Sequence, residues 1–342
     1  MNKTTLESKW QLKDAIALYQ QPFQDLIFKA QTTHRQNFNP NEIQASTLVN
    51  IQQGGCPEDC KWCSQSIHND TKIKLYPLMK KTEVLTKAKL AKQRGASRIC
   101  LGAAWRNPSR TQLATVSDMV KDIKALGLET CVTLGQLTIE QAKTLKSNGL
   151  DYYNHNLESS PEHFAKMTTT RKYEDRLKTL QNAQQADLKL CSGGIVGMGE
   201  TRDDQIALLV NLANLSPQPQ SVPINQLIPI PGTPMAHDTD PVDEISYVRL
   251  IAIARIMMPK AYIRLSAGRE ALSETTQTLA FLAGANSFFL GEKLLTTNNR
   301  DFEQDQLLLS KLGMQFDSPG IVQDRPISTM TNITTEVCVH DH

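Results

Sequence analysis

The sequence has 342 residues, with 37 Lys and Arg against 35 Asp and Glu, so its net charge is close to zero. A near-neutral chain without basic stretches interleaved with aromatic residues is not typical of nucleic-acid-binding proteins. No apolar run is long enough to span a bilayer, and the 7 cysteines occur without an export signal, which indicates a reducing compartment. We therefore expect a cytoplasmic protein that acts on a small molecule, with no nucleic acid and no membrane as partner.

The first 40 residues predict an N-terminal helical extension. Apolar residues recur at helical spacing between residues 4 and 36, Pro22 interrupts the pattern, and the polar run 37–41 ends it. After residue 318 the sequence is Thr-rich and has no period. We expect three parts: the extension 1–40, a folded domain 41–318, and a flexible tail 319–342.

From about residue 43 the pattern alternates between strand and helix, as a parallel barrel of βα units requires. The candidate strands are 44–51, 97–102, 129–134, 151–156, 188–195, 222–228, 261–266 and 286–290. The candidate helices are 81–94, 111–126, 138–148, 173–185, 203–215, 242–257 and 274–282. This alternation predicts an α/β fold, a (β/α)8 TIM-type barrel, whose active site lies at the C-terminal ends of the strands.

Three cysteines lie within eight residues, at Cys56, Cys60 and Cys63, with the spacing C-x3-C-x2-C. Four thiolates would close a metal site, whereas three on one loop leave a position open to an outside ligand. A structural zinc loop with His68 as fourth ligand is the alternative. Zinc loops usually combine a C-x2-C pair with a second pair or with histidines, and no second pair is present. The spacing therefore favours an iron–sulfur cluster with an open site.

Four further polar or thiol residues fall one to a strand on the predicted barrel: Cys100, Cys131, Cys191 and Arg264. Each cysteine alone could be a small apolar filler, which is common for buried cysteine. Three on separate strands of one barrel favour a common site. A buried Arg needs partners, so we expect Arg264 to meet anionic groups in the interior. The set predicts a second metal site.

The spacing over residues 56–63 resembles that of the radical S-adenosylmethionine (SAM) superfamily. The second set, with the segments YYNHNLE (152–158), VPINQL (222–227) and RLSAGRE (264–270), resembles the biotin synthase family over about residues 40–315. The resemblance implies a [4Fe-4S] cluster on Cys56, Cys60 and Cys63 that cleaves SAM to a 5′-deoxyadenosyl radical. It also implies a [2Fe-2S] cluster on Cys100, Cys131, Cys191 and Arg264 that donates sulfur.

The implied reaction inserts sulfur between two saturated carbons of dethiobiotin to form biotin, the last step of biotin biosynthesis. The cluster ligands are the only catalytic residues that we assign. The resemblance further implies a flavodoxin-type electron donor and a homodimer.

Three asparagines on the barrel strands have the amide groups that match the ureido ring of dethiobiotin, which both donates and accepts hydrogen bonds. We assign Asn154 and Asn225 to this substrate and Asn156 to the boundary between substrate and SAM. The glycine-rich segment GGIVGMGE (193–200) resembles a SAM-binding motif of the superfamily. The remaining SAM-binding assignments are Glu158, which stands where the family has Asp, and Gly193, Ile195, Gly197 and Glu200.

Two other functions remain open. One is a different radical SAM enzyme with an auxiliary cluster, and the other is a non-catalytic iron–sulfur sensor. Arg264 and the three asparagines favour the biotin synthase family over a different radical SAM enzyme. Glu200 and its neighbouring glycines favour an enzyme over a sensor. Cys338 in the segment CVHDH resembles a metal ligand, but a flexible tail is a poor preorganised site.

Overall fold

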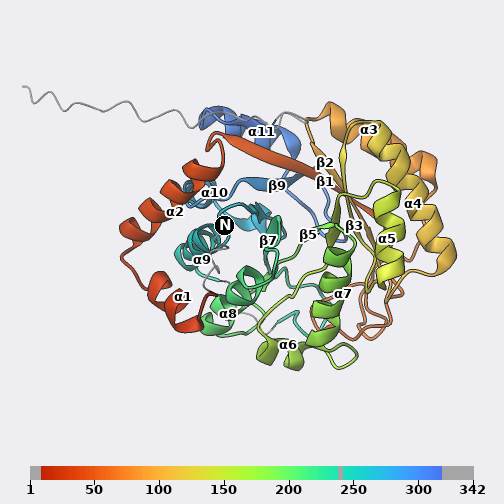
Figure 1. Cartoon of the computed structure of the whole chain (residues 1–342), viewed down its shortest axis with the longest axis horizontal. Helices are drawn as coiled ribbons and strands as arrows, with labels where there is room; N and C mark the ends of the chain where they lie inside the picture. The colour runs from red at the N-terminus through yellow and green to blue at the C-terminus, as the bar shows by residue number, and fades with distance from the viewer. Residues whose placement is uncertain (1–8, 238–241, 318–342) are drawn as a thin grey trace, which may run out of the picture.

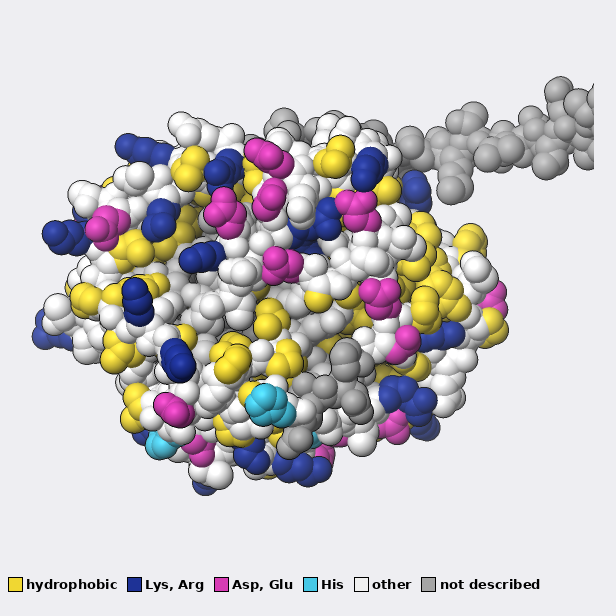
Figure 2. Space-filling model, turned by 180° about the vertical axis from the view of Figure 1, so that it is seen from behind, with side chains coloured by type: hydrophobic (Ala, Val, Ile, Leu, Met, Phe, Trp, Pro, Cys, Tyr) yellow, Lys and Arg dark blue, Asp and Glu magenta, His cyan; other side chains and the backbone are white. Residues whose placement is uncertain are grey.

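The structure, a computed structural model, describes residues 9–237 and 242–317. The tail 319–342 and Cys338 lie outside the described residues. Within the described part, no helix combines the length and the apolar composition that a bilayer crossing requires. Figure 2 shows the face that lies behind Figure 1, where hydrophobic side chains gather around the middle and charges of both signs surround them.

A closed parallel barrel forms the centre of the molecule (Figure 1). The sheet runs in the order β1-β2-β3-β4-β5-β7-β8-β9, and β9 pairs with β1, which closes it. Strand β6 pairs with β7 and continues the position of β5. The predicted (β/α)8 barrel is therefore confirmed. The strands are β1 Glu42–Gln52, β2 Arg98–Ala103, β3 Glu129–Thr133, β4 Tyr152–Asn154, β5 Lys189–Cys191, β6 Gly194–Val196, β7 Ser221–Gln226, β8 Tyr262–Leu265 and β9 Ser287–Leu290.

Helices surround the barrel strands (Figure 1). Ser109, Thr138 and Thr201 cap three of the helices, because each side-chain oxygen accepts a hydrogen bond from the third backbone N–H of its helix. The helices after the first strand are α3 Lys81–Gln93, α4 Arg110–Ala125, α5 Ile139–Ser147, α6 Pro161–Met167, α7 Tyr173–Gln185, α8 Arg202–Ala213, α9 Glu244–Met257, α10 Glu274–Leu282 and α11 Phe302–Lys311, with a 3-10 turn η1 at Arg269–Ala271.

Two helices precede the barrel, α1 Leu12–Tyr19 and α2 Phe23–Asn37, and Pro22 is the N-cap of α2. Helix α1 lies against the barrel helices α8 and α9, and α2 lies against α9. The backbone N–H of Trp10 donates to Asn214 at 2.9 Å, and Arg249 donates to the carbonyl of Tyr19 at 2.8 Å. The N-terminal segment is therefore tied to the outer helix layer.

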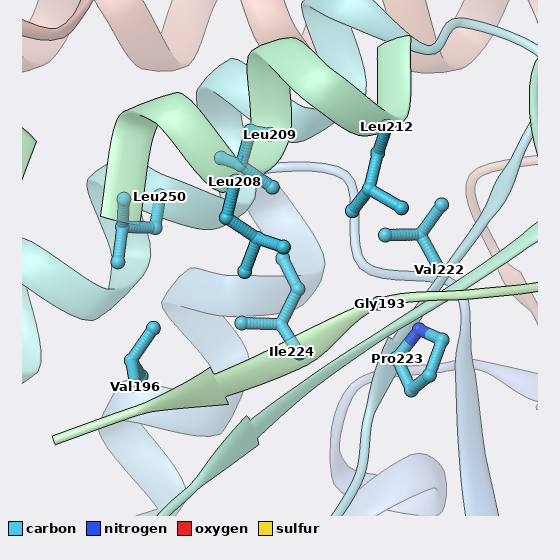
Figure 3. Close-up of a pocket in the computed structure, with 10 residues that line it drawn as sticks. Gly193, Val196, Leu208, Leu209, Leu212, Val222, Pro223, Ile224 and Leu250 are labelled. Atoms are coloured by element: carbon cyan, nitrogen blue, oxygen red, sulfur yellow. The ribbon is translucent and has the colours of Figure 1, made fainter. Parts of the chain in front are cut away.

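Two predicted strands were wrong in their extent. The range 151–156 is a strand only over Tyr152–Asn154, so Asn156 follows β4 and does not lie on it. The range 188–195 is divided into β5 and β6, because Gly193 leaves the ladder: its carbonyl accepts from the N–H groups of Leu157 and Glu158 at 2.9 and 3.1 Å. A Cβ at Gly193 would lie 1.8 Å from the carbonyl oxygen of Pro223. The close approach requires glycine. Figure 3 shows the apolar side chains of α8 and β7 packed around a small void of about 10 Å³ beside this point.

Sequence reasoning also missed three elements. Helices α6 and α11 were not predicted, and neither was strand β10 Gln315–Phe316, which pairs with the start of β1 at Glu42 and Ile43. Helix α6 has only seven residues, and its N-cap Ser160 accepts a hydrogen bond from the N–H of His163. Short capped helices of this kind carry too little apolar periodicity to be recognised.

Candidate active site

The three clustered cysteines lie on the loop between β1 and α3. The N–H of Cys63 donates to the carbonyl of Cys60 at 3.1 Å, and the Asn69 amide donates to the carbonyls of Cys60 and Cys63 at 3.0 and 2.8 Å. The carbonyl of Cys56 accepts from the N–H of Ile67 at 2.9 Å. The loop therefore folds back on itself and is fixed by its own backbone and by one amide side chain.

Asp59, between the first two cysteines, joins this loop to the segment between α6 and α7. Its carboxylate accepts from the Thr168 hydroxyl at 2.6 Å and from the N–H groups of Thr169 and Thr170 at 2.9 and 3.1 Å. Burial alone would raise the pKa of Asp59, but the hydrogen bonds from the threonines hold this pKa well below its usual range. Asp59 is thus an ionised clamp on the cysteine loop.

Glu58 provides a second attachment. It is 2% exposed, and its Oε1 lies 2.6 Å from Nε of Arg106 and 3.2 Å from Nε of Arg171. Burial raises the pKa of Glu58, but the Thr170 hydroxyl and the two guanidinium groups outweigh it, so the net shift is downward. The cysteine loop is held through adjacent carboxylates to two other loops of the barrel mouth.

The thiols of this loop are poor acids when no cation is bound. Burial raises the pKa of Cys60 to about 11 and that of Cys63 to about 12, and it raises the pKa of Cys56 as well. Arg176 and Arg171 oppose the shift at Cys60 without overcoming it. Soft thiols that become thiolates only beside added positive charge fit the binding of iron.

The register of the strands brings the other three cysteines together inside the barrel. Cys100 on β2 is the register partner of Cys131 on β3, and Cys191 on β5 is the register partner of Asn154 on β4. The thiols of Cys100, Cys131 and Cys191 are all buried. A hydrogen bond from Cys131 lowers the pKa of Cys100 and of Cys191, and Arg264 lowers both further. The pKa of the shared donor, Cys131, is raised. The predicted convergence of these strands is present.

Arg264 is 1% exposed, and its side-chain partners are one cysteine sulfur and three neutral polar side chains. Nη1 lies 4.0 Å from Sγ of Cys191, Nη2 donates to Ser46 at 3.0 Å and to Gln44 at 3.2 Å, and Nε donates to Ser287 at 2.9 Å. These acceptors are neutral side chains and a thiol. No carboxylate pairs with Arg264 in residues 9–237 and 242–317. Its buried charge therefore fits an anionic ligand set on the three sulfurs.

In the described part of the chain, no three His, Cys, Asp or Glu side chains meet at a point where they could hold one metal ion. His68, considered as a zinc ligand, is exposed, and its Nε2 lies 3.2 Å from the Pro57 carbonyl oxygen. In a [4Fe-4S] cluster each protein ligand binds a different iron atom, and in a [2Fe-2S] cluster the ligands are divided between two irons, so the ligands of a cluster need not meet at one point.

The three predicted asparagines lie around the same interior space. Asn154 accepts from the Thr133 hydroxyl at 2.9 Å and donates to Sγ of Cys191 at 3.3 Å. Asn225 donates to the Gly194 carbonyl at 2.8 Å and accepts from the Ala267 N–H at 3.1 Å. Their amides are oriented by neighbouring groups rather than free to rotate, which suits recognition of a rigid ligand.

Glu158 and Arg176 form an ion pair, of which only Glu158 was predicted from the sequence. Nη1 of Arg176 lies 3.5 Å from Oε1 of Glu158 and donates to the Asn156 carbonyl at 2.7 Å. Glu158 has φ 71°, a conformation that is uncommon for a residue other than glycine and often marks a functional site. Arg176 could not be recognised from the sequence pattern, because it lies on helix α7 and not at the end of a barrel strand, where site residues are expected.

The other predicted SAM-binding residues divide into two groups. Ile195 lines a cavity, as described below. Glu200 instead accepts from the N–H groups of Gly197 and Met198 at 2.7 and 2.6 Å, and so stabilises its own turn. Gly193 accepts the close approach of Pro223. Gly193, Gly197 and Glu200 shape the backbone around this end of the barrel.

Two adjoining cavities of about 300 and 230 Å³ occupy the barrel mouth. Cys63, Asn156, Glu158 and Asn225 line both cavities, so the two cavities share part of their walls. Ile195 and Thr296 line the smaller one. The larger one connects the two cysteine groups, and its lining includes Cys56, Cys63, Arg176, Asn154, Cys100, Cys131, Cys191 and Arg264. Cys60 is buried and is not part of the described lining.

Solved structures share this architecture. A methylornithine synthase aligns with a TM-score of 0.77 at 18% identity, covering 92% of this chain and 96% of that one. An FeFe-hydrogenase maturase from Carboxydothermus hydrogenoformans aligns with a TM-score of 0.76 at 17% identity, covering 90% of this chain and 76% of that one. At this level of identity the likeness shows the fold alone.

Sequence relatives are much more similar. Residues 50–213 match the radical SAM superfamily, and residues 223–315 match the biotin and thiamin synthesis associated domain. A biotin synthase of Colwellia psychrerythraea is 54% identical over 313 residues, 92% of this chain and 90% of the relative. One of Acinetobacter baumannii is 53% identical over 328 residues, 96% of this chain and 99% of the relative. The chain therefore belongs to the biotin synthase family.

Proposed function

We propose that this protein is a radical SAM enzyme that converts dethiobiotin to biotin by inserting one sulfur atom between two saturated carbons. The observation that carries the proposal is the cavity of about 300 Å³ lined by cysteines of both groups. A substrate in this space would lie between a radical source at one end and a sulfur source at the other. Family membership supports the same reaction.

The first group of thiols, Cys56, Cys60 and Cys63, would hold the [4Fe-4S] cluster. With three protein ligands, one iron remains open to the amino and carboxylate groups of SAM. When bound, the cluster supplies the single electron that cleaves the sulfonium of SAM to methionine and a 5′-deoxyadenosyl radical. Abstraction of hydrogen from an unactivated carbon needs such a radical, because no side-chain base removes that hydrogen at neutral pH.

The second group, Cys100, Cys131, Cys191 and Arg264, would hold the [2Fe-2S] cluster that supplies the sulfur. Arg264 serves this site because its charge is buried and its other hydrogen-bond partners are neutral. The protein holds that cation in one position with three side-chain acceptors. A fixed guanidinium stabilises the negative charge of the sulfurs around it.

The remaining residues of the cavity bind and orient the reactants. Arg176 and Glu158 present a cation and an anion side by side, which matches the carboxylate and the ribose hydroxyls of SAM. Asn154 and Asn225 offer amides to the ureido ring of dethiobiotin. Because cysteines of both groups line one cavity, a substrate radical formed there would lie close to the sulfur source. Two carbon–hydrogen bonds are broken, which requires two SAM molecules per biotin.

We further propose a cytoplasmic homodimer that receives electrons from a flavodoxin-type donor. A cytoplasmic location agrees with cysteine thiols that must remain reduced to bind iron. The roles of Gly193, Ile195, Gly197 and Glu200 toward SAM remain part of the proposal, with Ile195 as the one that borders the open cavity.

Anaerobic turnover tests the function directly. Reconstituted protein is incubated with dethiobiotin, SAM and a reductant, and biotin and 5′-deoxyadenosine are measured by mass spectrometry. We expect biotin with about two molecules of 5′-deoxyadenosine for each biotin formed, because one radical removes one hydrogen. Formation of 5′-deoxyadenosine without biotin would favour a different radical SAM enzyme, and formation of neither would contradict an enzymatic role.

A further inference from the structure

Two large apolar side chains are exposed over the backbone that leads into the cysteine loop. Ile67 is 63% exposed and Leu75 is 72% exposed. The N–H of Ile67 donates to the Cys56 carbonyl at 2.9 Å. A Cβ at Gly54 would lie 2.1 Å from Leu75, so the leucine covers the backbone two residues before Cys56. Two large apolar side chains that are exposed beside the backbone of the cysteine loop favour an interaction surface.

Positive charge accompanies these apolar groups. Lys72 and Lys74 are exposed on the same segment as Leu75, and the Lys74 carbonyl accepts from the Gln53 side chain at 2.7 Å, which fixes the segment beside the loop. In the segment 61–80, the exposed charged residues are Lys61, Lys72, Lys74 and Lys80 against Asp70 alone. None of these lysines forms an ion pair within the described parts of the chain.

This local excess differs from the chain as a whole, which carries 37 basic and 35 acidic residues. Besides the exposed Asp70, the carboxylates on the cysteine loop are Glu58 and Asp59, which are already engaged by Arg106 and by the threonines 168–170. They therefore do not neutralise the exposed lysines. The surface presents exposed apolar groups beside lysines that have no ion-pair partner in residues 9–237 and 242–317, which is complementary to an acidic protein surface with an apolar centre.

The same surface offers a short path to the first cysteine. Cys56 is partly exposed, whereas Cys60 is buried. From Ile67 the path to Cys56 crosses one hydrogen bond of 2.9 Å, and the His68 ring lies 3.2 Å from the carbonyl oxygen of Pro57, the next residue. A partner seated here would contact the loop within a few bonds of a cluster ligand.

We propose that Ile67, His68, Lys72, Lys74 and Leu75, here called the donor face, dock an acidic one-electron carrier protein. This inference rests on the proposed function and names the surface through which that function receives its electrons. Each encounter transfers one electron: the carrier is oxidised by one electron, and that electron is consumed when the sulfonium C–S bond of one SAM breaks to give methionine and the 5′-deoxyadenosyl radical. The radical gains a hydrogen atom from the substrate and leaves as 5′-deoxyadenosine.

The experiment compares a double charge reversal on this surface with a matched reversal elsewhere. The test variant is Lys72→Glu with Lys74→Glu, and the control is Lys121→Glu with Lys143→Glu, exposed lysines of α4 and α5 that give the same change in net charge. Ile67→Ser tests the apolar part without a charge change. The probe is a reduced acidic flavodoxin, whose Kd for the reconstituted protein is measured by surface plasmon resonance at low and high ionic strength.

We expect the test variant to raise the Kd for flavodoxin about tenfold at low ionic strength, with a smaller difference at high salt, because screening weakens exposed charge interactions. The control should bind as the wild type does. Flavodoxin-supported formation of 5′-deoxyadenosine should fall in the test variant, while formation supported by dithionite, a small reductant that needs no docking surface, should not change. Ile67→Ser should raise the Kd at both ionic strengths.

The two arms separate the docking surface from the function. If the wild-type protein does not cleave SAM with dithionite as the reductant, the proposed function itself is contradicted. Equal flavodoxin binding by the test variant, the control and the wild type would overturn the donor face. A second result would also contradict the donor face: the test variant changes its oligomeric state in light scattering but still binds flavodoxin. The surface would then be an interface with a second copy of the chain.

Discussion

The amide nitrogen of Asn154 lies 3.3 Å from the sulfur of Cys191, so a residue assigned to the substrate touches a residue assigned to the sulfur source. The contact follows from the register of β4 and β5, in which these two residues are paired. The substrate-binding end of the cavity and the inner cysteine group are therefore adjacent parts of one site.

Replacement of Asn154 by alanine should weaken biotin formation more than SAM cleavage. The variant lacks the amide N–H that donates to the Cys191 sulfur and the amide oxygen that accepts from the Thr133 hydroxyl. Hydrogen bonds of this kind contribute about 1.5–3 kcal/mol when one partner is charged. We expect kcat/KM for biotin formation to fall by about tenfold to a hundredfold. The ratio of 5′-deoxyadenosine to biotin should rise. Asn37→Ala, on the exposed face of α2, is the control; an unchanged ratio in Asn154→Ala would contradict the assignment.

Cys131→Ala should separate the two cysteine groups. Cys131 is the register partner of Cys100 and lines the same cavity as Cys100 and Cys191, so its loss removes one thiol of the inner group and leaves Cys56, Cys60 and Cys63 intact. We expect SAM cleavage to persist and biotin formation to disappear, both followed by mass spectrometry.

The control for this variant is Cys338→Ala, at the cysteine outside the described residues, which should behave as the wild type. Biotin formation by Cys131→Ala at the wild-type rate would show that sulfur does not come from the inner group.

His34 on α2 should make the protein less stable in acid. It is 1% exposed, and burial together with Arg255 and Arg35 lowers its pKa to about 3. An unfolded histidine titrates near pH 6.5. Below that pH the unfolded chain binds a proton that the folded chain does not, so stability falls as pH decreases from about 6.5 toward 3, by up to about 1.4 kcal/mol per pH unit.

His34→Phe removes this proton and keeps an aromatic ring beside Phe38, whose centroid lies 5.8 Å away. Urea unfolding of the variant should therefore show a flatter pH profile than the wild type between pH 6.5 and 4, with similar free energies of unfolding at pH 8. Parallel profiles for the two proteins would contradict the buried neutral state of His34.

Gly193→Ala should destabilise the fold strongly. Its Cβ would lie 1.8 Å from the Pro223 carbonyl oxygen, so β7 or the break between β5 and β6 must shift, at a cost of about 3 kcal/mol or more. At Gly199, where φ is +80° and nothing lies within 4 Å of a Cβ, alanine should cost only about 1–2 kcal/mol for its left-handed backbone. Thermal unfolding of both variants checks the difference, and equal losses would show that the close approach at Gly193 is relaxed easily.

The strand and helix pattern predicted most of the barrel because each βα unit buries its own apolar face. Helix α7 was predicted as 173–185, the observed bounds, since its apolar spacing is regular. The break at Gly193 could not be read in this way: it depends on hydrogen bonds from the backbone N–H groups of Leu157 and Glu158, which lie in the segment that follows β4.

The candidate site shows the same division. The convergence of Cys100, Cys131 and Cys191 could be predicted, because parallel strands in register bring equivalent positions together. The position of Arg176 could not, since it depends on how α7 packs against Phe164 and the end of β4. Nor could the neutral partners of Arg264, because Gln44, Ser46 and Ser287 become its neighbours only when β9 closes the barrel on β1.

We propose that one barrel holds two different clusters at the two ends of one cavity. Mössbauer spectroscopy of anaerobically reconstituted protein, with iron and sulfide counts, tests this arrangement most directly. We expect one [4Fe-4S] and one [2Fe-2S] cluster per chain. A [4Fe-4S] cluster alone, with Cys100, Cys131 and Cys191 still free after full reconstitution, would contradict it.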